Sequence, residues 1–437
     1  MEDTRLGTIL LESEIIEEAE LEKCLDIQTL TGGSRPLGQI LVEQGLLDLQ
    51  TLTRLLDQQH ERAVRHRQGS PPLAIESDSA QGYVEQAVKL GASELVVSEG
   101  RPVLVKICGS WNHLTPEPLR GPEVWDFVRA EMGNEVLEAL ADRRFVHREL
   151  HKPGLCRGRI AAFRQFDGVA VTLRLHPEAV RTPAELALPP QLIELLRTAK
   201  GLVLIAGEHG SGRTEIMARV LHEVAQEPSR YVLVLDDSAE FPLPTGGALV
   251  ARRRIGDHVI DYPTGLRTAV REDPDALLVG DVSNPDAFDL ALRAAEGGRL
   301  VVACLPAAGV LSALHRVLNF YPGYDVGRVR TTLATVLRAV LACHLLPAAD
   351  GGGVLPANEF MLVDDAVRDV LRAGELQNLS LLLRLEGGSS GYSLDRSLLQ
   401  LLAAGKVMFE DVFARAEEKA WVLDQSRALA APPKAKE

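Results

Sequence analysis

The chain has 437 residues, of which 46% are hydrophobic and 4% aromatic, and its formal net charge is −14. A hydrophobic fraction of this size argues for folded domains rather than intrinsic disorder, and the length suffices for roughly two to four of them. The acidic balance argues against a broad nucleic-acid-binding surface, which would carry an excess of Lys and Arg.

The cysteines and the hydropathy pattern indicate the compartment. The scattered cysteines form no CxxC pair and read as reduced thiols of a cytosolic protein: Cys24, Cys108, Cys156, Cys304 and Cys343. The first residues carry no secretory signal pattern, and no apolar run approaches the ~20 residues of a membrane-spanning helix. The sequence therefore predicts a cytoplasmic protein, with any membrane contact made through partners.

Residues 1–60 contain a tandem repeat, because Leu6-Gly7 recurs as Leu37-Gly38 and similar apolar segments follow each pair. Leucines at four-residue spacing predict two short helices per copy. One interpretation is a ligand site around the two Leu-Gly pairs; the other, which we favour, is a small helical docking domain. A polar stretch rich in Gly, Ser and Pro, residues 61–80, is expected to be a linker.

Residues 81–185 show the mixed pattern of an α+β domain. A helix is expected at 83–90, strands at 94–98 and 103–108, and a hairpin at 159–164 and 169–175.

Residues 186–425 have an α/β pattern, in which short apolar runs alternate with helical segments. Such alternation is typical of a mainly parallel sheet with crossover helices. The strands are expected at 202–207, 231–236, 276–280 and 300–305. Residues 310–422 are expected to be largely amphipathic helix, and 426–437 a disordered tail.

The first of these strands runs into GEHGSGRT, residues 207–214, and then into a helix-forming stretch. The segment fits the phosphate-loop pattern GxxxxGK[ST], except that Arg213 stands at the lysine position. Glycines let backbone N–H groups surround phosphate oxygens, the helix dipole assists, and the hydroxyl of Thr214 can ligate Mg²⁺. The predicted phosphate-binding residues are Gly207, Gly210, Ser211, Gly212, Arg213 and Thr214.

Arg213 keeps the positive charge of the missing lysine but not its compact shape, so phosphate binding can survive while catalytic alignment suffers. The alternative is a glycine-rich turn that binds nothing. Several glycines followed by Thr214 after a β run make that alternative the weaker one.

Four longer segments, taken in order, resemble the motifs of a known family. They are LGASELVVSEGRPVLVKICGSW (90–111), YVLVLDDSAEF (231–241), LRTAVREDPDALLVGDV (266–282) and AAEGGRLVVACLPA (294–307). They are similar to the N-terminal signature, Asp box, Walker B segment and His box of the type II/IV secretion ATPases, near the pilus-retraction branch. The resemblance covers nearly the whole chain and implies a RecA-like P-loop NTPase core after an α+β, PAS-like domain. The N-terminal repeat resembles that of type II secretion ATPases, some of which bind cyclic di-GMP.

The resemblance assigns catalytic roles with several departures from the pattern. Asp281 replaces the glutamate that activates the attacking water, and Asp236 replaces the Asp-box glutamate, each one methylene shorter. Glu240 is retained in the Asp box, and Arg267 and Arg271 stand where arginines support the nucleotide site. The two His-box histidines are replaced by Arg299 and Pro306.

These features leave three hypotheses. The first is a motor subunit that binds ATP and Mg²⁺, forms a ring expected to be hexameric, and hydrolyses ATP slowly or conditionally. The second is a pseudo-ATPase with a regulatory or structural role, for example in a mixed ring with an active paralogue. The third is a cyclic di-GMP sensor with an inert core. The resemblance implies an inner-membrane platform protein as partner, and no nucleic acid is expected.

Overall fold

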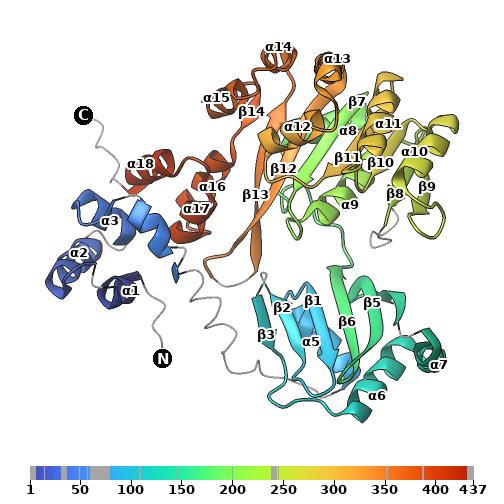
Figure 1. Cartoon of the computed structure of the whole chain (residues 1–437), viewed down its shortest axis with the longest axis horizontal. Helices are drawn as coiled ribbons and strands as arrows, with labels where there is room; N and C mark the ends of the chain where they lie inside the picture. The colour runs from blue at the N-terminus through green and yellow to red at the C-terminus, as the bar shows by residue number, and fades with distance from the viewer. Residues whose placement is uncertain are drawn as a thin grey trace. The chain divides into compact units, whose positions relative to one another are not determined.

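Figure 1 shows the computed structural model of the chain. It describes residues 6–13, 15–30, 37–48, 50–56, 58–59, 79–107, 110–143, 145–198, 200–237, 244, 246–350, 353–385 and 388–430. Two compact units are present: Met1–His176 with Pro347–Gly353 and Leu398–Glu437, and Pro177–Leu346 with Val354–Ser397.

The N-terminal repeat is helical in both copies, as the leucine spacing predicts. Its helices are α1 (Leu6–Glu12), α2 (Glu18–Leu30) and α3 (Leu37–Glu43), and residues 50–56 are also helical. A Cβ placed on Gly7 would lie 3.3 Å from Leu21 Cδ2, and one on Gly38 would lie 2.9 Å from Leu52 Cδ1. The recurring glycines therefore have a packing role, since they let leucines of the repeat approach the backbone closely.

The repeat shares its hydrophobic core with the C-terminal helices of the same unit. Phe409, Phe413 and Leu423 join Ile9 and Ile40 in one buried cluster. The C-terminal helices are α16 (Leu394–Ala403), α17 (Phe409–Arg415) and α18 (Lys419–Ala430). Because α18 continues to Ala430, the first residues of the tail expected at 426–437 are helical; residues 431–437 and most of the expected linker lie outside the described residues.

The α+β domain forms where the sequence predicts it. Its strands form a six-stranded sheet in the order β3-β2-β1-β6-β5-β4. The elements are α5 (Ala80–Lys89), β1 (Glu94–Ser98), β2 (Leu104–Ile107), β3 (Ser110–His113), α6 (Gly121–Met132), α7 (Asn134–Arg143), β4 (Phe145–Lys152), β5 (Cys156–Gln165) and β6 (Gly168–Pro177). Alternate residues such as Leu95 and Val97 pack against Phe127 of α6, as a half-buried antiparallel strand requires.

The second unit is built on an eight-stranded sheet in the order β14-β13-β12-β7-β11-β10-β8-β9. Pairing is parallel from β12 through β7, β11, β10 and β8 to β9. The strands are β7 (Gly201–Gly207), β8 (Tyr231–Asp236), β9 (Leu249–Arg254), β10 (Ala276–Val279), β11 (Leu300–Leu305), β12 (Leu337–Pro347), β13 (Val354–Leu362) and β14 (Gly391–Tyr392). The four strands predicted from apolar runs are confirmed.

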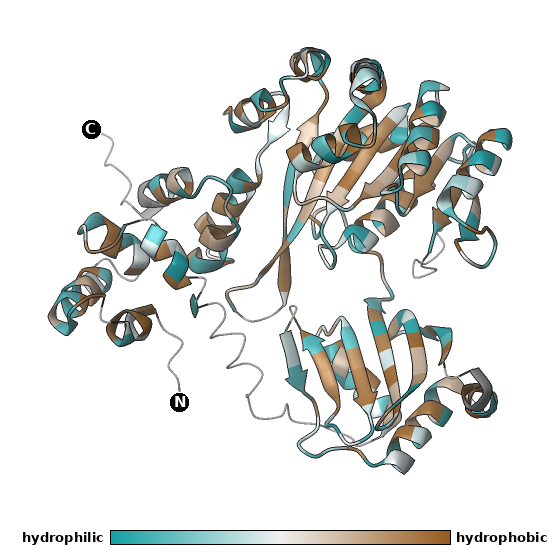
Figure 2. Cartoon of the chain, in the orientation of Figure 1, coloured by the Kyte–Doolittle hydropathy of each residue, from teal (hydrophilic) through white to brown (hydrophobic). Residues whose placement is uncertain are grey.

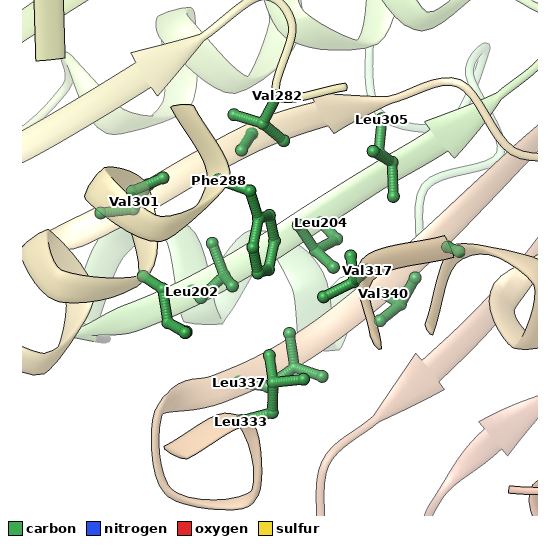
Figure 3. Close-up of a cluster of buried hydrophobic side chains, with 14 of the residues drawn as sticks. Leu202, Leu204, Val282, Phe288, Val301, Leu305, Val317, Leu333, Leu337 and Val340 are labelled. Atoms are coloured by element: carbon green, nitrogen blue, oxygen red, sulfur yellow. The ribbon is translucent and has the colours of Figure 1, made fainter. Parts of the chain in front are cut away.

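Helices cover both faces of this sheet, which explains why its central strands are apolar throughout (Figure 2). The helices are α8 (Pro190–Thr198), α9 (Arg213–Val224), α10 (Tyr262–Arg271), α11 (Pro285–Glu296), α12 (Val310–Leu318), α13 (Gly323–Val336), α14 (Asp365–Ala373) and α15 (Asn378–Arg384). Val203 and Ile205 face the cluster containing α8 and α9. Leu202 and Leu204 face the other, where Phe288 of α11 lies among them (Figure 3).

The expectation that 310–422 is largely helical is wrong in part, because β12, β13 and β14 lie between its helices. The run LRAVLACHLLP of β12 is apolar on both faces, since it pairs with β7 inside the sheet. A short, continuously apolar run does not distinguish a buried strand from a buried helix. Among the described helices, none has both the length and the apolar character needed to cross a membrane.

Candidate nucleotide site

The phosphate loop connects β7 to α9 at the carboxyl end of the parallel strands. Gly210 and Gly212 adopt φ of 78° and 92°, conformations that favour glycine. A Cβ on Gly207 would lie 2.2 Å from Ser211 Oγ, so the loop closes only with glycine there. The Ser211 hydroxyl is buried and has no hydrogen-bond partner among the described residues. An unpartnered hydroxyl inside a glycine-lined loop at a helix N-terminus is suited to an anionic oxygen.

Three carboxylates, two of them predicted, gather at the same edge of the sheet, because β8 and β10 are parallel neighbours and end together. Asp236 is the buried last residue of β8, and the exposed Asp237 follows it. Gly280 directly precedes Asp281 after β10 and faces the end of β8. A Cβ on Gly280 would lie 2.3 Å from Asp236 Oδ1. Glycine at 280 therefore keeps space open between the carboxylates.

The Asp281 carboxylate is held by its neighbour in the turn after β10. Its Oδ1 accepts the Ser283 backbone N–H at 3.0 Å, and its Oδ2 accepts the Ser283 hydroxyl at 2.6 Å. These two bonds fix the direction of the side chain that the resemblance makes the general base. They also occupy both carboxylate oxygens, each of which has a further lone pair to offer.

Arg213 brings positive charge to this acidic group. It is half-buried at the start of α9, and its Cγ lies 3.0 Å from where a Cβ on Gly207 would be. Burial raises the pKa of the Cys304 thiol beneath the loop to about 12, with Arg213 opposing the rise and Asp236 and Asp281 adding to it. Since β11, which carries Cys304, lies between β7 and β10, the arginine and the carboxylates lie at the same edge of the sheet.

Tyr262 is a member of this site that the sequence did not indicate. Its hydroxyl lies 2.9 Å from where a Cβ on Gly280 would be. Burial, followed by the charges of Asp237, Asp236 and Asp281, raises the pKa of the hydroxyl well above its usual range. The local signal was only a helix start, with Asp261 as N-cap and Pro263 in the first turn.

Other predicted residues are not brought to this group. Arg267 and Arg271 are exposed and lie further along α10, about 7 and 13 Å from Tyr262 at 1.5 Å per residue. Glu240 lies outside the described residues. Pro306 directly follows β11 at the site edge, whereas Arg299 precedes that strand at the opposite edge and pairs with Asp273.

The residues present fit a nucleotide with Mg²⁺. The loop offers an unpartnered Ser211 hydroxyl and a glycine-lined turn, and Gly280 leaves a gap that any side chain would fill. Thr214 lies half-buried in the first turn of α9, where a hydroxyl can ligate a cation bound to the phosphates.

Comparison with known proteins supports the same assignment. The model of the type II/IV secretion system protein family matches residues 142–370. The Pseudomonas aeruginosa type IV pilus retraction ATPase PilT is 28% identical over 76% of this chain and 96% of its own length. The Escherichia coli protein YggR is 31% identical over 68% of this chain and 90% of its own length.

A solved structure extends the match to the fold. The crystal structure of the pilus retraction motor PilT with bound ADP has a TM-score of 0.66 and 27% identity, over 77% of this chain and 97% of that one. The expected order, an α+β domain followed by a RecA-like core, is thereby confirmed.

Proposed function

This chain belongs to the type II/IV secretion system protein family, and we propose that it is an ATP- and Mg²⁺-binding motor subunit of a type IV pilus or type II secretion machine. In this proposal it hydrolyses ATP slowly or conditionally to drive assembly or retraction of a pilus or pseudopilus. The observation that carries the proposal is the gathering of the phosphate loop, Arg213, Asp236 and Asp281 at one edge of the parallel sheet, where Gly280 leaves space beside Asp236.

The roles of the residues follow from their chemistry. Backbone N–H groups of the loop and the Ser211 hydroxyl bind phosphate oxygens, and Arg213 adds positive charge where negative charge develops. Asp281, oriented by Ser283, accepts a proton from the attacking water. The Thr214 hydroxyl would hold Mg²⁺, which would supply positive charge to offset the negative charge of the phosphoryl group.

A pseudo-ATPase is the second candidate, and three observations favour it. Arg213 cannot reproduce lysine geometry, Asp281 is short and already engaged with Ser283, and Pro306 has no donor. Removing one positioned electrostatic group commonly costs about 3–4 kcal/mol in the barrier. Several such changes together would abolish turnover while nucleotide binding persists.

The proposed assembly is a ring, expected to be hexameric, with nucleotide between subunits. Arg267 and Arg271 are exposed on α10, as residues that serve a neighbour's nucleotide must be. The proposed partner is an inner-membrane platform protein, which would hold the ring at the cytoplasmic face; a mixed ring with an active paralogue belongs to the pseudo-ATPase proposal. Cyclic di-GMP binding by the repeat stays a prediction, and the packing of Gly7 and Gly38 gives these glycines a structural role that needs no ligand.

The deciding experiment is steady-state phosphate release with Mg-ATP by the wild type, Asp281→Ala and the control Asp369→Ala, whose carboxylate is 78% exposed on α14. We expect a loss of about 100-fold in Asp281→Ala and a change within about two-fold in the control. Equal background rates in all three proteins, with binding of a fluorescent ADP analogue retained, would rule out the motor and favour the pseudo-ATPase.

A further inference from the structure

Tyr262 places a hydroxyl inside the candidate site from an element that no catalytic motif marks. It is the first residue of α10, and the helix start is fixed because Asp261 Oδ1 accepts the Thr264 N–H at 2.8 Å. The ring packs against the core cluster that contains Leu235 and Leu266. The ring therefore has a packing role, whereas the hydroxyl points to the gap beside Gly280 and Asp236.

The hydroxyl has no structural task of its own. It is buried and its proton has no acceptor among the described residues, and the nearby Asp237 backbone N–H is a donor that tends to lower the pKa of the phenol. A buried hydroxyl without an acceptor is destabilising, and a phenylalanine would fill the same apolar space without that penalty. A buried hydroxyl that has no acceptor in the described part of the chain is therefore better explained by a hydrogen bond to a bound ligand.

The charges around the hydroxyl indicate what it can do. Asp236 lies beside the same gap, and the charges of Asp237, Asp236 and Asp281 together with burial raise the pKa of the phenol and keep it protonated. Carboxylates repel an anionic phosphoryl group, so a phosphoryl oxygen can enter only beside a donor or a cation. Arg213 supplies the cation on the loop side, and Tyr262 supplies a neutral donor on the carboxylate side.

We propose that the Tyr262 hydroxyl is a positioning group that donates a hydrogen bond to an oxygen of the transferring phosphoryl group. This inference rests on the proposed binding of ATP. It explains why a tyrosine, and not merely an aromatic ring, begins α10 opposite a glycine. It also adds a donor to a site whose lysine is replaced by Arg213 and whose general base is shortened to Asp281.

The test uses Tyr262→Phe, which removes only the hydroxyl, and Tyr231→Phe as the matched control. The Tyr231 hydroxyl donates to Glu272 at 3.1 Å. Tyr231 begins the strand that Asp236 ends, about 16 Å away at 3.3 Å per residue. The readout is the affinity for Mg-ADP with aluminium fluoride, which mimics the transferring phosphoryl group, divided by the affinity for Mg-ADP alone.

We expect Tyr262→Phe to lower this ratio by about ten-fold or more, with affinity for Mg-ADP alone unchanged and thermal stability equal or higher. Tyr231→Phe should leave the ratio unchanged. An unchanged ratio in Tyr262→Phe, equal losses of both affinities, or a wild type that shows no preference for the fluoride complex would each overturn the inference.

Turnover of the wild type is measured separately and tests the proposed motor function. If the wild type shows no turnover but a preference for the fluoride complex that Tyr262→Phe loses, the motor proposal fails and the role of Tyr262 stands.

Discussion

The two edges of the sheet in the RecA-like core differ in how far their polar and charged side chains are paired with one another. Where the parallel strands begin, charged side chains pair with each other. Glu223 accepts from Arg197 at 2.7 Å and pairs with Arg219, and Arg299 pairs with Asp273. Among the described residues, Arg219 and Arg299 each leave an Nε atom without a partner there, on guanidinium groups already bonded through other nitrogens.

Where the strands end, polar groups are gathered and two buried hydroxyls among them are left unmatched. The charges of Asp236, Asp281 and Arg213 all act on the buried Cys304 thiol, while the hydroxyls of Ser211 and Tyr262 have no hydrogen-bond partner among the described residues. Both edges flank the same apolar strands, so packing does not explain the contrast. The paired edge contributes to folding stability, and the unmatched edge is preorganised for a ligand that supplies the missing partners.

The largest expected effect comes from filling the gap at the unmatched edge. In Gly280→Ala the new Cβ would lie 2.3 Å from Asp236 Oδ1 and 2.9 Å from the Tyr262 hydroxyl, so both groups must move. We expect ATP turnover to fall by about 100-fold and the free energy of unfolding by about 1–3 kcal/mol. Phosphate release and urea unfolding measure the two effects.

The matched control is Gly323→Ala, because a Cβ on Gly323 would have no neighbour within 4 Å. It should change both quantities little. Turnover in Gly280→Ala equal to that of the wild type would show that the gap is not where the ligand reacts, and the contrast between the edges would lose its functional meaning.

At the paired edge, Glu223→Gln should affect stability and leave nucleotide binding alone. Burial tends to raise the pKa of this carboxyl, but hydrogen bonds from Arg197 and Arg219 outweigh it and the net pKa is lowered. The charged form is then favoured by folding, so its stabilisation is present above the unfolded pKa of about 4.3 and is lost as pH falls through the folded value.

We therefore expect Glu223→Gln to lower the free energy of unfolding at pH 7 by about 2 kcal/mol, and by less as the pH falls below about 4. Urea unfolding at both pH values checks this, with the exposed Glu227→Gln as control. A loss that stays the same at low pH would mean that packing, and not the carboxylate charge, makes the difference.

The sequence predicted the strands that end at the unmatched edge better than it predicted all the side chains that gather there. The apolar runs located β7, β8, β10 and β11, because strands buried on both faces are continuously apolar. The phosphate-loop spacing then located Ser211 and Arg213, and the family resemblance located Asp236 and Asp281 after two of these strands. All these residues lie next to a strand whose position is determined by a run of apolar residues in the sequence.

Tyr262 and β12 could not be found in the same way, since tertiary contacts define both. Tyr262 joins the site because α10 packs across β8 and brings its first turn to Gly280, a contact between segments distant in sequence. The run of β12 is apolar enough for either a strand or a helix, and its pairing with β7 decides between them. The arginine pairs at the opposite edge likewise carry no short-range signal.

The smallest effect is expected from Arg299→Ala, at the position where the resemblance places a His-box histidine. Arg299 lies at the paired edge, donates to the Val270 carbonyl at 3.3 Å, and pairs with Asp273, which adopts a φ of 53°. It thus holds the carboxyl end of α10, where a positive charge is favourable. Because the Asp273 side chain is 86% exposed, the pair should contribute no more than about 1 kcal/mol to the free energy of unfolding.

Turnover per folded molecule should not change in Arg299→Ala, because β11 separates this residue from Pro306 by about 23 Å at 3.3 Å per residue. Arg293→Ala, in which the lost side chain is 71% exposed, serves as the control for removing an arginine. A drop in turnover without a change in stability would mean that the paired edge also takes part in the reaction. An unchanged turnover would mean that the altered His-box position now stabilises the fold, and that whatever catalysis the chain performs depends on the opposite edge.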